Sequence, residues 1–232
     1  MRSAQQQDCI ELYTRPELHA STLWLHGQGA TGTDMDSFIT HMHRSRELGL
    51  HHLAPNAGLR RLTIRNGLPM RAWFDIKGDP AEVGEDAEGI RESSARIHAL
   101  LDDECDRGIP STCILLGGFS QGASLALFSA LRYAKPLAGA VMFAGELLLE
   151  DTLQAERHPA NASLPILLLH GRRDENTPIE LARHARDRLS ELGHPVELLE
   201  FDLAHEVSLE QIARMDDWAF PLLQQAIRLS EA

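Results

Sequence analysis

The chain has 232 residues, of which 43% are hydrophobic and 24% charged, and its formal net charge at pH 7 is -12. A chain of this length and composition can bury one sizeable core. We expect residues 1–8 to form a flexible tail and residues 9–232 to form a single domain. The acidic charge disfavours nucleic acid and anionic lipid surfaces as partners, because the summed field repels phosphates.

Cysteine usage and hydropathy indicate a cytoplasmic protein. The three cysteines are an odd number without a C-x-x-C pair, so we expect reduced thiols. No run of 18 apolar residues predicts a membrane span, and the first residues lack the apolar region of a signal peptide. The pairs His41/His43 and His51/His52 lack partner ligands at suitable spacing, so we expect solvated histidines rather than a metal site.

Short apolar runs recur along the chain and predict strands. Such runs lie at 21–25, 113–116, 138–144 and 166–169, and a further strand is expected at 196–201. Runs that are apolar without alternation are typical of strands covered on both faces, as in a parallel sheet between helices.

Helical patterns separate these runs. Apolar residues between positions 83 and 101 share one face of a helix of about six turns. A capping box at Thr177–Glu180 predicts the start of a helix that ends at Gly193. Ser208 and Gln211 predict a last helix, which Pro221 should kink or break. Alternating strands and helices predict an α/β fold of the doubly wound type, with a mostly parallel central sheet and helices on both faces.

The segment Gly118-Phe119-Ser120-Gln121-Gly122 connects the strand at 113–116 to a helical run of small and apolar residues. A G-x-S-x-G pattern between a strand and a helix is typical of a nucleophile elbow, which exposes a serine hydroxyl above the sheet. Ser120 is therefore the candidate nucleophile. The alternative is that Ser120 only caps the following helix.

A serine nucleophile needs a histidine base and an acid that orients it. Active groups of this architecture lie beyond the carboxyl ends of the strands, a position that His205 satisfies among the twelve histidines. Asp174 follows the strand at 166–169 and is the best acid, with Glu175 and Asp202 as competitors. The order Ser120, Asp174, His205 is that of α/β hydrolases. Alternatively, Asp174 forms a surface ion pair with a neighbouring arginine.

The glycine-rich turn after the strand at 21–25 is the second candidate part of the site. Acyl transfer needs two backbone N–H groups directed at the developing oxyanion, one of them from the residue after the nucleophile. We expect Gln121 and Gln28 to supply these groups. The alternative is an ordinary turn in which His26 packs as a structural group.

Together these segments resemble the carboxylesterase and acyl-protein thioesterase family of small α/β hydrolases, which are related to lysophospholipases. The resemblance spans most of the chain and rests on 25–32 (LHGQGATG), 54–57 (APNA), 70–76 (MRAWFDI), 117–122 (GGFSQG), and His170-Gly171 with Asp174 and Pro178. It implies esterase or thioesterase activity with Ser120, Asp174 and His205 as the triad, and it implies no cofactor. The chain departs from the family pattern at Arg65, Ala123, Ala144 and Glu206.

The long segment between Asn56 and Asp75 shows little periodicity, and such loops often cover sites. Leu68, Met70 and Trp73 are the candidate substrate contacts, unless they only fill gaps in the core.

The expected substrate is a small acyl ester, thioester or lysophospholipid-like molecule, and we expect a monomer or homodimer. Two alternatives stay open. One is a peptidase or dienelactone-type hydrolase on the same scaffold, and the other is a binding protein that retains the fold without turnover.

Overall fold

The computed structural model describes residues 8–78 and 84–231. Most of the expected N-terminal tail, residues 1–7, therefore lies outside the described residues. Asp8, the last residue of the expected tail, is held by the domain: its backbone oxygen accepts a hydrogen bond from Asn56 N at 2.9 Å, and its carboxylate accepts one from Asn56 Nδ2 at 2.8 Å.

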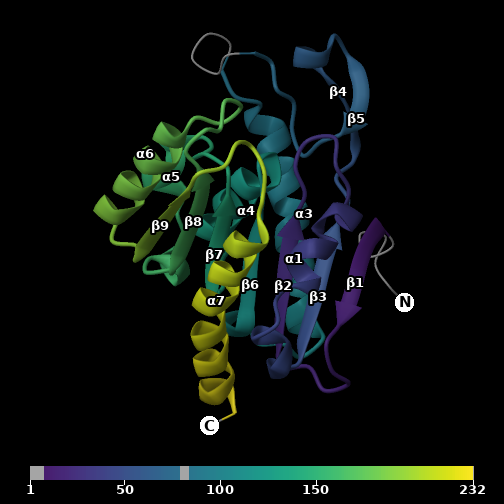
Figure 1. Cartoon of the computed structure of the whole chain (residues 1–232), viewed down its shortest axis with the longest axis vertical. Coiled ribbons are helices and arrows are strands. Elements are labelled where there is room, and N and C mark those ends of the chain that lie inside the picture. The colour runs from purple at the N-terminus through teal and green to yellow at the C-terminus, as the bar shows by residue number, and fades with distance from the viewer. Residues whose placement is uncertain (1–7, 79–83, 232) are drawn as a thin grey trace.

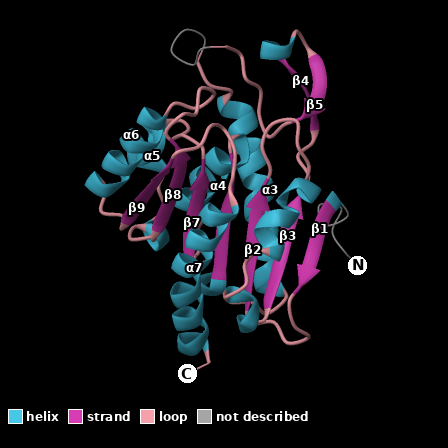
Figure 2. Ribbon diagram, in the orientation of Figure 1, coloured by secondary structure: helices cyan, strands magenta, loops and turns pink. Residues whose placement is uncertain are grey.

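A seven-stranded sheet in the order β1-β3-β2-β6-β7-β8-β9 forms the centre of the molecule (Figures 1 and 2). Only β1 runs antiparallel to its neighbour, β3, and every other pair is parallel, which confirms the predicted mostly parallel sheet. The strands are β1 (Cys9–Tyr13), β2 (Ala20–Leu25), β3 (Leu50–Pro55), β6 (Ile114–Phe119), β7 (Gly139–Phe143), β8 (Ile166–Gly171) and β9 (Val196–Phe201).

Helices cover both faces of this sheet. In Figures 1 and 2, α1 and α7 lie in front of the strands, and α3 and α4 lie behind them. Every residue of α4 from Gln121 to Leu131 is buried, as expected for a helix enclosed between the sheet and α3. The helices are α1 (Asp36–Thr40), α3 (Ala87–Asp106), α4 (Gln121–Arg132), α5 (Glu150–Glu156), α6 (Ile179–Glu191) and α7 (Leu209–Ser230).

The two predicted capping boxes have different outcomes. At α7 the box forms as expected, with Ser208 Oγ accepting from Gln211 N at 3.2 Å and Gln211 Oε1 accepting from Ser208 N at 2.9 Å. At α6 the prediction was wrong: the helix begins at Ile179, and the N–H of Thr177 donates to Asp174 Oδ1 at 2.8 Å. Asp174, beyond the end of β8, thus accepts the N–H of Thr177 that a capping box would have directed to Glu180.

Two further helix predictions need correction. The helix expected over 83–101 begins at Ala87 behind an Asp86 cap, and position 83 itself lies outside the described residues. The break expected at Pro221 does not occur, because α7 continues to Ser230. Pro221 and Asp217, the residue whose carbonyl loses its intrahelical donor, are both exposed, while buried Ala219 and Leu223 keep both halves packed on the core.

The interpretation of His51 and His52 as solvated was wrong, because both residues lie on the central strand β3. Both side chains are fully buried within the sheet. His52 Nδ1 lies 2.7 Å from Thr22 Oγ1 on the neighbouring strand, and His51 Nδ1 lies 2.8 Å from Glu104 Oε2 on α3. Polar partners from other elements allow these two rings to occupy the core.

The segment between Asn56 and Asp75 contains a small antiparallel hairpin, β4 (Leu59–Leu62) and β5 (Leu68–Arg71). The hairpin projects beyond the main sheet at the top of Figure 1. Its base contacts the turn that follows β2, since Gly29 N donates to Arg71 O at 2.8 Å. The hairpin is thereby attached to the glycine-rich turn singled out in the sequence.

Candidate active site

Ser120 occupies a strained turn between β6 and α4. Its φ of 55° and ψ of -125° are unusual for a residue with a side chain, and its N–H donates to Phe143 O on β7 at 2.8 Å. The turn requires close backbone approach, because a Cβ on Gly122 would lie 2.3 Å from Leu25 O. Ser120 makes no side-chain cap to α4, which argues against the capping alternative.

The side chains of Ser120, His205 and Asp174 form a hydrogen-bonded chain at the carboxyl edge of the sheet. His205 Nε2 lies 2.9 Å from Ser120 Oγ, and His205 Nδ1 lies 2.7 Å from Asp174 Oδ2. Asp174 Oδ1 accepts the N–H groups of Asn176 and Thr177 at 2.9 and 2.8 Å. The buried carboxylate is therefore fixed by its own turn before it meets the imidazole.

Neither competing acid forms a hydrogen bond with His205 in the described part of the chain. Glu175 is exposed, and exposed Asp202 forms an ion pair with Arg173, whose Nε lies 2.8 Å from Asp202 Oδ1. Arg172 donates to Glu200 O at 3.3 Å, so neither of these arginines takes Asp174 as a partner. Of the three acids considered in the sequence, Asp174 is the one that touches the histidine.

His170, to which the sequence analysis gave no role of its own, lies next to this carboxylate. Its Nε2 donates to Thr177 O at 2.7 Å and lies 3.6 Å from Asp174 Oδ2. Burial lowers the pKa of His170, which keeps the ring neutral at neutral pH. Its place at the end of β8, four residues before the acid, was the available sequence signal.

The backbone N–H groups of Gln28 and Gln121 are both free to bind an oxyanion. Among the described residues neither group donates a hydrogen bond, and Gln121 is the first residue of α4, where the helix dipole favours negative charge. The turn after β2 approaches Ser120 closely, since a Cβ on Gly27 would lie 3.4 Å from Ser120 Cβ.

His26 packs as a structural group beneath this turn. Its Nδ1 donates to Gly27 O at 2.7 Å, and its Nε2 accepts the N–H of Ala57 at 2.9 Å. Both bonds together require the neutral ring with the proton on Nδ1. Burial lowers the pKa of His26, which favours that neutral form.

The three candidate substrate contacts occupy different environments. Leu68 is 62% exposed on β5, and half-buried Met70 accepts a hydrogen bond on Sδ from Gln28 Nε2 at 3.3 Å. Trp73 is only 1% exposed, and its indole N–H donates to His26 O at 2.8 Å. The structure thus places Leu68 and Met70 on the hairpin, where a substrate can reach them, and Trp73 behind the turn.

The hydrogen bonds between Ser120, His205 and Asp174 form in the presence of the four departures from the family pattern. Arg65 is exposed at the end of the hairpin, and Glu206 is exposed beside His205. Ala123 is buried in α4. Ala144 follows β7 with a φ of 51° and donates its N–H to Leu169 O at 3.0 Å.

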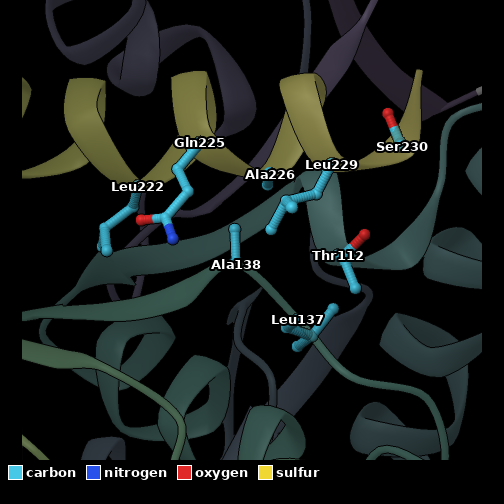
Figure 3. Close-up of a pocket in the computed structure, with 8 residues that line it drawn as sticks. All are labelled: Thr112, Leu137, Ala138, Leu222, Gln225, Ala226, Leu229 and Ser230. Carbon is cyan, nitrogen blue, oxygen red and sulfur yellow. The ribbon is translucent and has the colours of Figure 1, made fainter. Parts of the chain in front are cut away.

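A groove of about 370 Å³ lies at the opposite edge of the sheet, between α7 and the residues that precede β6 and β7 (Figure 3). It carries no titratable side chain: its walls are Thr112, Leu137, Ala138, Leu222, Gln225, Ala226, Leu229 and Ser230. The described residues also contain no cluster of three or more potential metal ligands and no helix that could cross a membrane. The triad at the carboxyl edge is therefore the candidate active site.

A parallel sheet, a strained serine between strand and helix, and a serine–histidine–aspartate chain in this order define an α/β hydrolase. The chain belongs to the phospholipase/carboxylesterase family, whose model matches residues 12–219.

Individual relatives agree with this assignment. The chain is 32% identical over 222 residues to acyl-protein thioesterase 1 of Neurospora crassa, covering 91% of this chain and 90% of the relative. It is 30% identical to carboxylesterase SOBER1 of Arabidopsis thaliana, covering 84% and 87%. The crystal structure of SOBER1 superposes with a TM-score of 0.82 at 29% identity, covering 88% of this chain and 99% of that one. Acyl-protein thioesterase 2 of Zea mays gives 0.79 at 28% identity, covering 92% and 99%.

Proposed function

We propose that the protein hydrolyses carboxylic esters or thioesters through an acyl-enzyme on Ser120. The observation that carries this proposal is the chain of hydrogen bonds from Ser120 through His205 to Asp174, built on a strained elbow. Its relatives include proteins named acyl-protein thioesterase and carboxylesterase.

In the first half of the reaction, His205 Nε2 takes the proton of Ser120 as Oγ attacks the carbonyl carbon. The negative charge on the carbonyl oxygen is stabilised by the N–H groups of Gln28 and Gln121. The intermediate then collapses to the acyl-enzyme, and His205 returns the proton to the departing alkoxide or thiolate.

In the second half, His205 deprotonates a water molecule that attacks the acyl-enzyme. The carboxylic acid leaves and Ser120 recovers its proton. Throughout, Asp174 keeps the proton of the neutral imidazole on Nδ1, so that Nε2 faces the serine, and it stabilises the imidazolium that forms.

The substrate in this proposal is a small acyl ester, thioester or lysophospholipid-like molecule, with Leu68 and Met70 contacting it from the hairpin. We propose a single cytoplasmic domain that acts as a monomer or homodimer. Profiling p-nitrophenyl esters and acyl thioesters of increasing chain length measures the preferred acyl group.

The test compares Ser120→Ala with Ser129→Ala, using p-nitrophenyl esters and labelling by a fluorophosphonate probe. Ser129 is a matched control on α4, because it is fully buried and its Oγ has no hydrogen-bond partner in the described part of the chain. Ser120→Ala should lose labelling and retain at most the roughly 10³- to 10⁴-fold acceleration over uncatalysed hydrolysis that binding and the oxyanion hole provide. Ester hydrolysis at the parent rate by Ser120→Ala would overturn the proposal.

The same experiment separates the two alternatives. A parent protein that turns over neither esters nor thioesters, and that the probe does not label, is a binding protein with this fold. A parent protein that is labelled but cleaves only amides or enol lactones is the peptidase or dienelactone-type hydrolase.

A further inference from the structure

The side chain of Gln121 connects the nucleophile elbow to the segment that follows β5. Its Oε1 accepts the backbone N–H of Trp73, and its Nε2 donates to Phe74 O, both at 2.9 Å. Gln121 is 6% exposed, and the two bonds use both ends of its amide. The residue whose backbone N–H faces the oxyanion is thus attached by its side chain to Trp73.

Trp73 continues this connection to the turn after β2. Its indole N–H donates to His26 O at 2.8 Å, and the two rings lie 5.2 Å apart. Ser93 Oγ on α3 donates a short hydrogen bond to Trp73 O. Trp73 is therefore held through its indole N–H, its backbone carbonyl and its backbone N–H by groups from three different segments of the chain.

His26 completes the connection at the peptide bond between Gly27 and Gln28. Its ring holds Gly27 O through Nδ1 and the N–H of Ala57 through Nε2. On the other side of Gln28, the N–H of Gly29 is bound to Arg71 O. The peptide that presents the N–H of Gln28 is thus held from both sides, while that N–H itself stays free.

We propose that Gln121, Trp73 and His26 form a brace that sets the distance and angle between the two oxyanion donors. The proposal rests on the proposed function, because it assigns these side chains a role in the same site. The side chains of Gln121, Trp73 and His26 are positioning groups, because they act through the backbone N–H groups of Gln28 and Gln121. The role of Trp73 is then support of the oxyanion hole in place of substrate contact.

Such a brace is needed because the two donors come from different strands. Gln28 follows β2 and Gln121 follows β6, and the last pair that these two strands form with each other is Leu25 with Gly118. Strand pairing fixes the backbone up to that point, but both donors lie beyond it. Donors must already point at the developing charge, because stabilisation comes from their preorganisation. A displacement of about 1 Å caused by a remote change can cost roughly 10²-fold in rate.

The test uses Trp73→Phe, which removes the indole N–H and retains an aromatic ring in the core. Trp24→Phe is the matched control. Trp24 is also fully buried, lies on β2, and has an indole N–H without a hydrogen-bond partner among the described residues. Both variants lose the same atoms, but only Trp73→Phe loses a bond of the brace.

We expect kcat for a p-nitrophenyl ester to fall about ten- to a hundredfold in Trp73→Phe and by less than about twofold in Trp24→Phe. Acylation and deacylation both pass through an oxyanion, so kcat falls whichever step limits the rate. The affinity for a trifluoromethyl ketone, whose adduct with serine carries an oxyanion, should fall by the same factor as kcat/KM. The affinity for a non-hydrolysable ether analogue of the ester should not change.

Gln121→Met provides a second, independent test, because it retains the length of the side chain and removes both of its hydrogen bonds. It should give the same pattern, and the double variant with Trp73→Phe should lose less than the product of the two single effects. If kcat and ketone affinity in both single variants match those of Trp24→Phe, the brace has no role. That failure is distinct from failure of the proposed function, in which the parent protein itself does not hydrolyse esters or thioesters.

Discussion

The Oδ2 atom of Asp174 lies 2.7 Å from Nδ1 of His205, although 31 positions separate the two residues in the chain. The approach depends on two parallel neighbours, β8 and β9, whose carboxyl ends lie side by side. The acid follows β8 and the histidine follows β9. The relationship between the two side chains is therefore a product of strand order.

Asp174→Asn should fold normally and lose activity by on the order of 10⁴-fold, as the same change does in serine proteases. An asparagine amide retains the shape of the carboxylate but favours the tautomer with the proton on Nε2. Steady-state hydrolysis of a p-nitrophenyl ester measures the loss. Asp202→Asn is the control, because Asp202 pairs with Arg173 at the surface. An equal loss in Asp202→Asn, or none in Asp174→Asn, contradicts the assignment of the acid.

Gly122→Ala should destabilise the protein by about 3 kcal/mol, because the added methyl group overpacks the site. The new Cβ would meet Leu25 O at 2.3 Å and His26 O at 2.4 Å, and both are backbone atoms that cannot rotate away. Gly58→Ala is matched to it, since nothing lies within 4 Å of the added methyl group, and it should change stability by less than about 0.5 kcal/mol. Urea unfolding measures the stability of both variants. Equal midpoints would show that the turn around Ser120 shifts to accommodate the added methyl group.

His52 should make the free energy of unfolding depend on pH. Burial, followed by the nearby His51, lowers the pKa of His52 from 6.5 to about 3. Between these values the unfolded chain binds a proton that the folded chain does not. The contribution of His52 to stability is therefore complete above pH 6.5 and is lost as the pH falls toward 3.

Urea unfolding between pH 7 and 4 measures this dependence. His52→Asn removes the titrating ring and should reduce the slope by up to one proton, which is about 1.4 kcal/mol per pH unit. The prediction fails if the slope in His52→Asn equals that of the parent protein.

The two helix starts that look alike in sequence should respond differently to loss of their hydroxyl groups. Ser208→Ala should cost about 1 kcal/mol, because it removes the acceptor for Gln211 N. Thr177→Ala should cost less than about 0.5 kcal/mol, since the Thr177 hydroxyl makes no hydrogen bond in the described part of the chain. The backbone N–H of residue 177, which donates to Asp174 Oδ1, is retained in the variant. Thermal unfolding compares the stability of the two variants. A larger loss of stability in Thr177→Ala than in Ser208→Ala would show that Thr177 caps α6 after all.

Apolar runs were sufficient to locate the central strands β2, β6, β7 and β8, because burial on both faces leaves a continuous hydrophobic signal. The strand expected at 196–201 also forms, as β9, although its residues are only half-buried or exposed. Apolar runs did not reveal β3, where His51 and His52 interrupt the signal. Those rings are buried against Glu104 on α3 and Thr22 on β2. Edge strand β1 was missed for a different reason: its side chains are only half-buried or exposed, so they carry no continuous apolar signal.

The sequence by itself determined the elbow at Ser120, the order of the three candidate triad residues, and the alternation that builds a parallel sheet. Each of these is local, because it depends on residues adjacent in the chain or on which end of a strand they follow. Only the tertiary structure decided that Asp174, and neither Glu175 nor Asp202, reaches His205. It also placed Trp73 beneath the turn that follows β2, bonded to Gln121 and His26. Such choices depend on packing between distant segments, where tenths of an ångström decide which donor meets which acceptor.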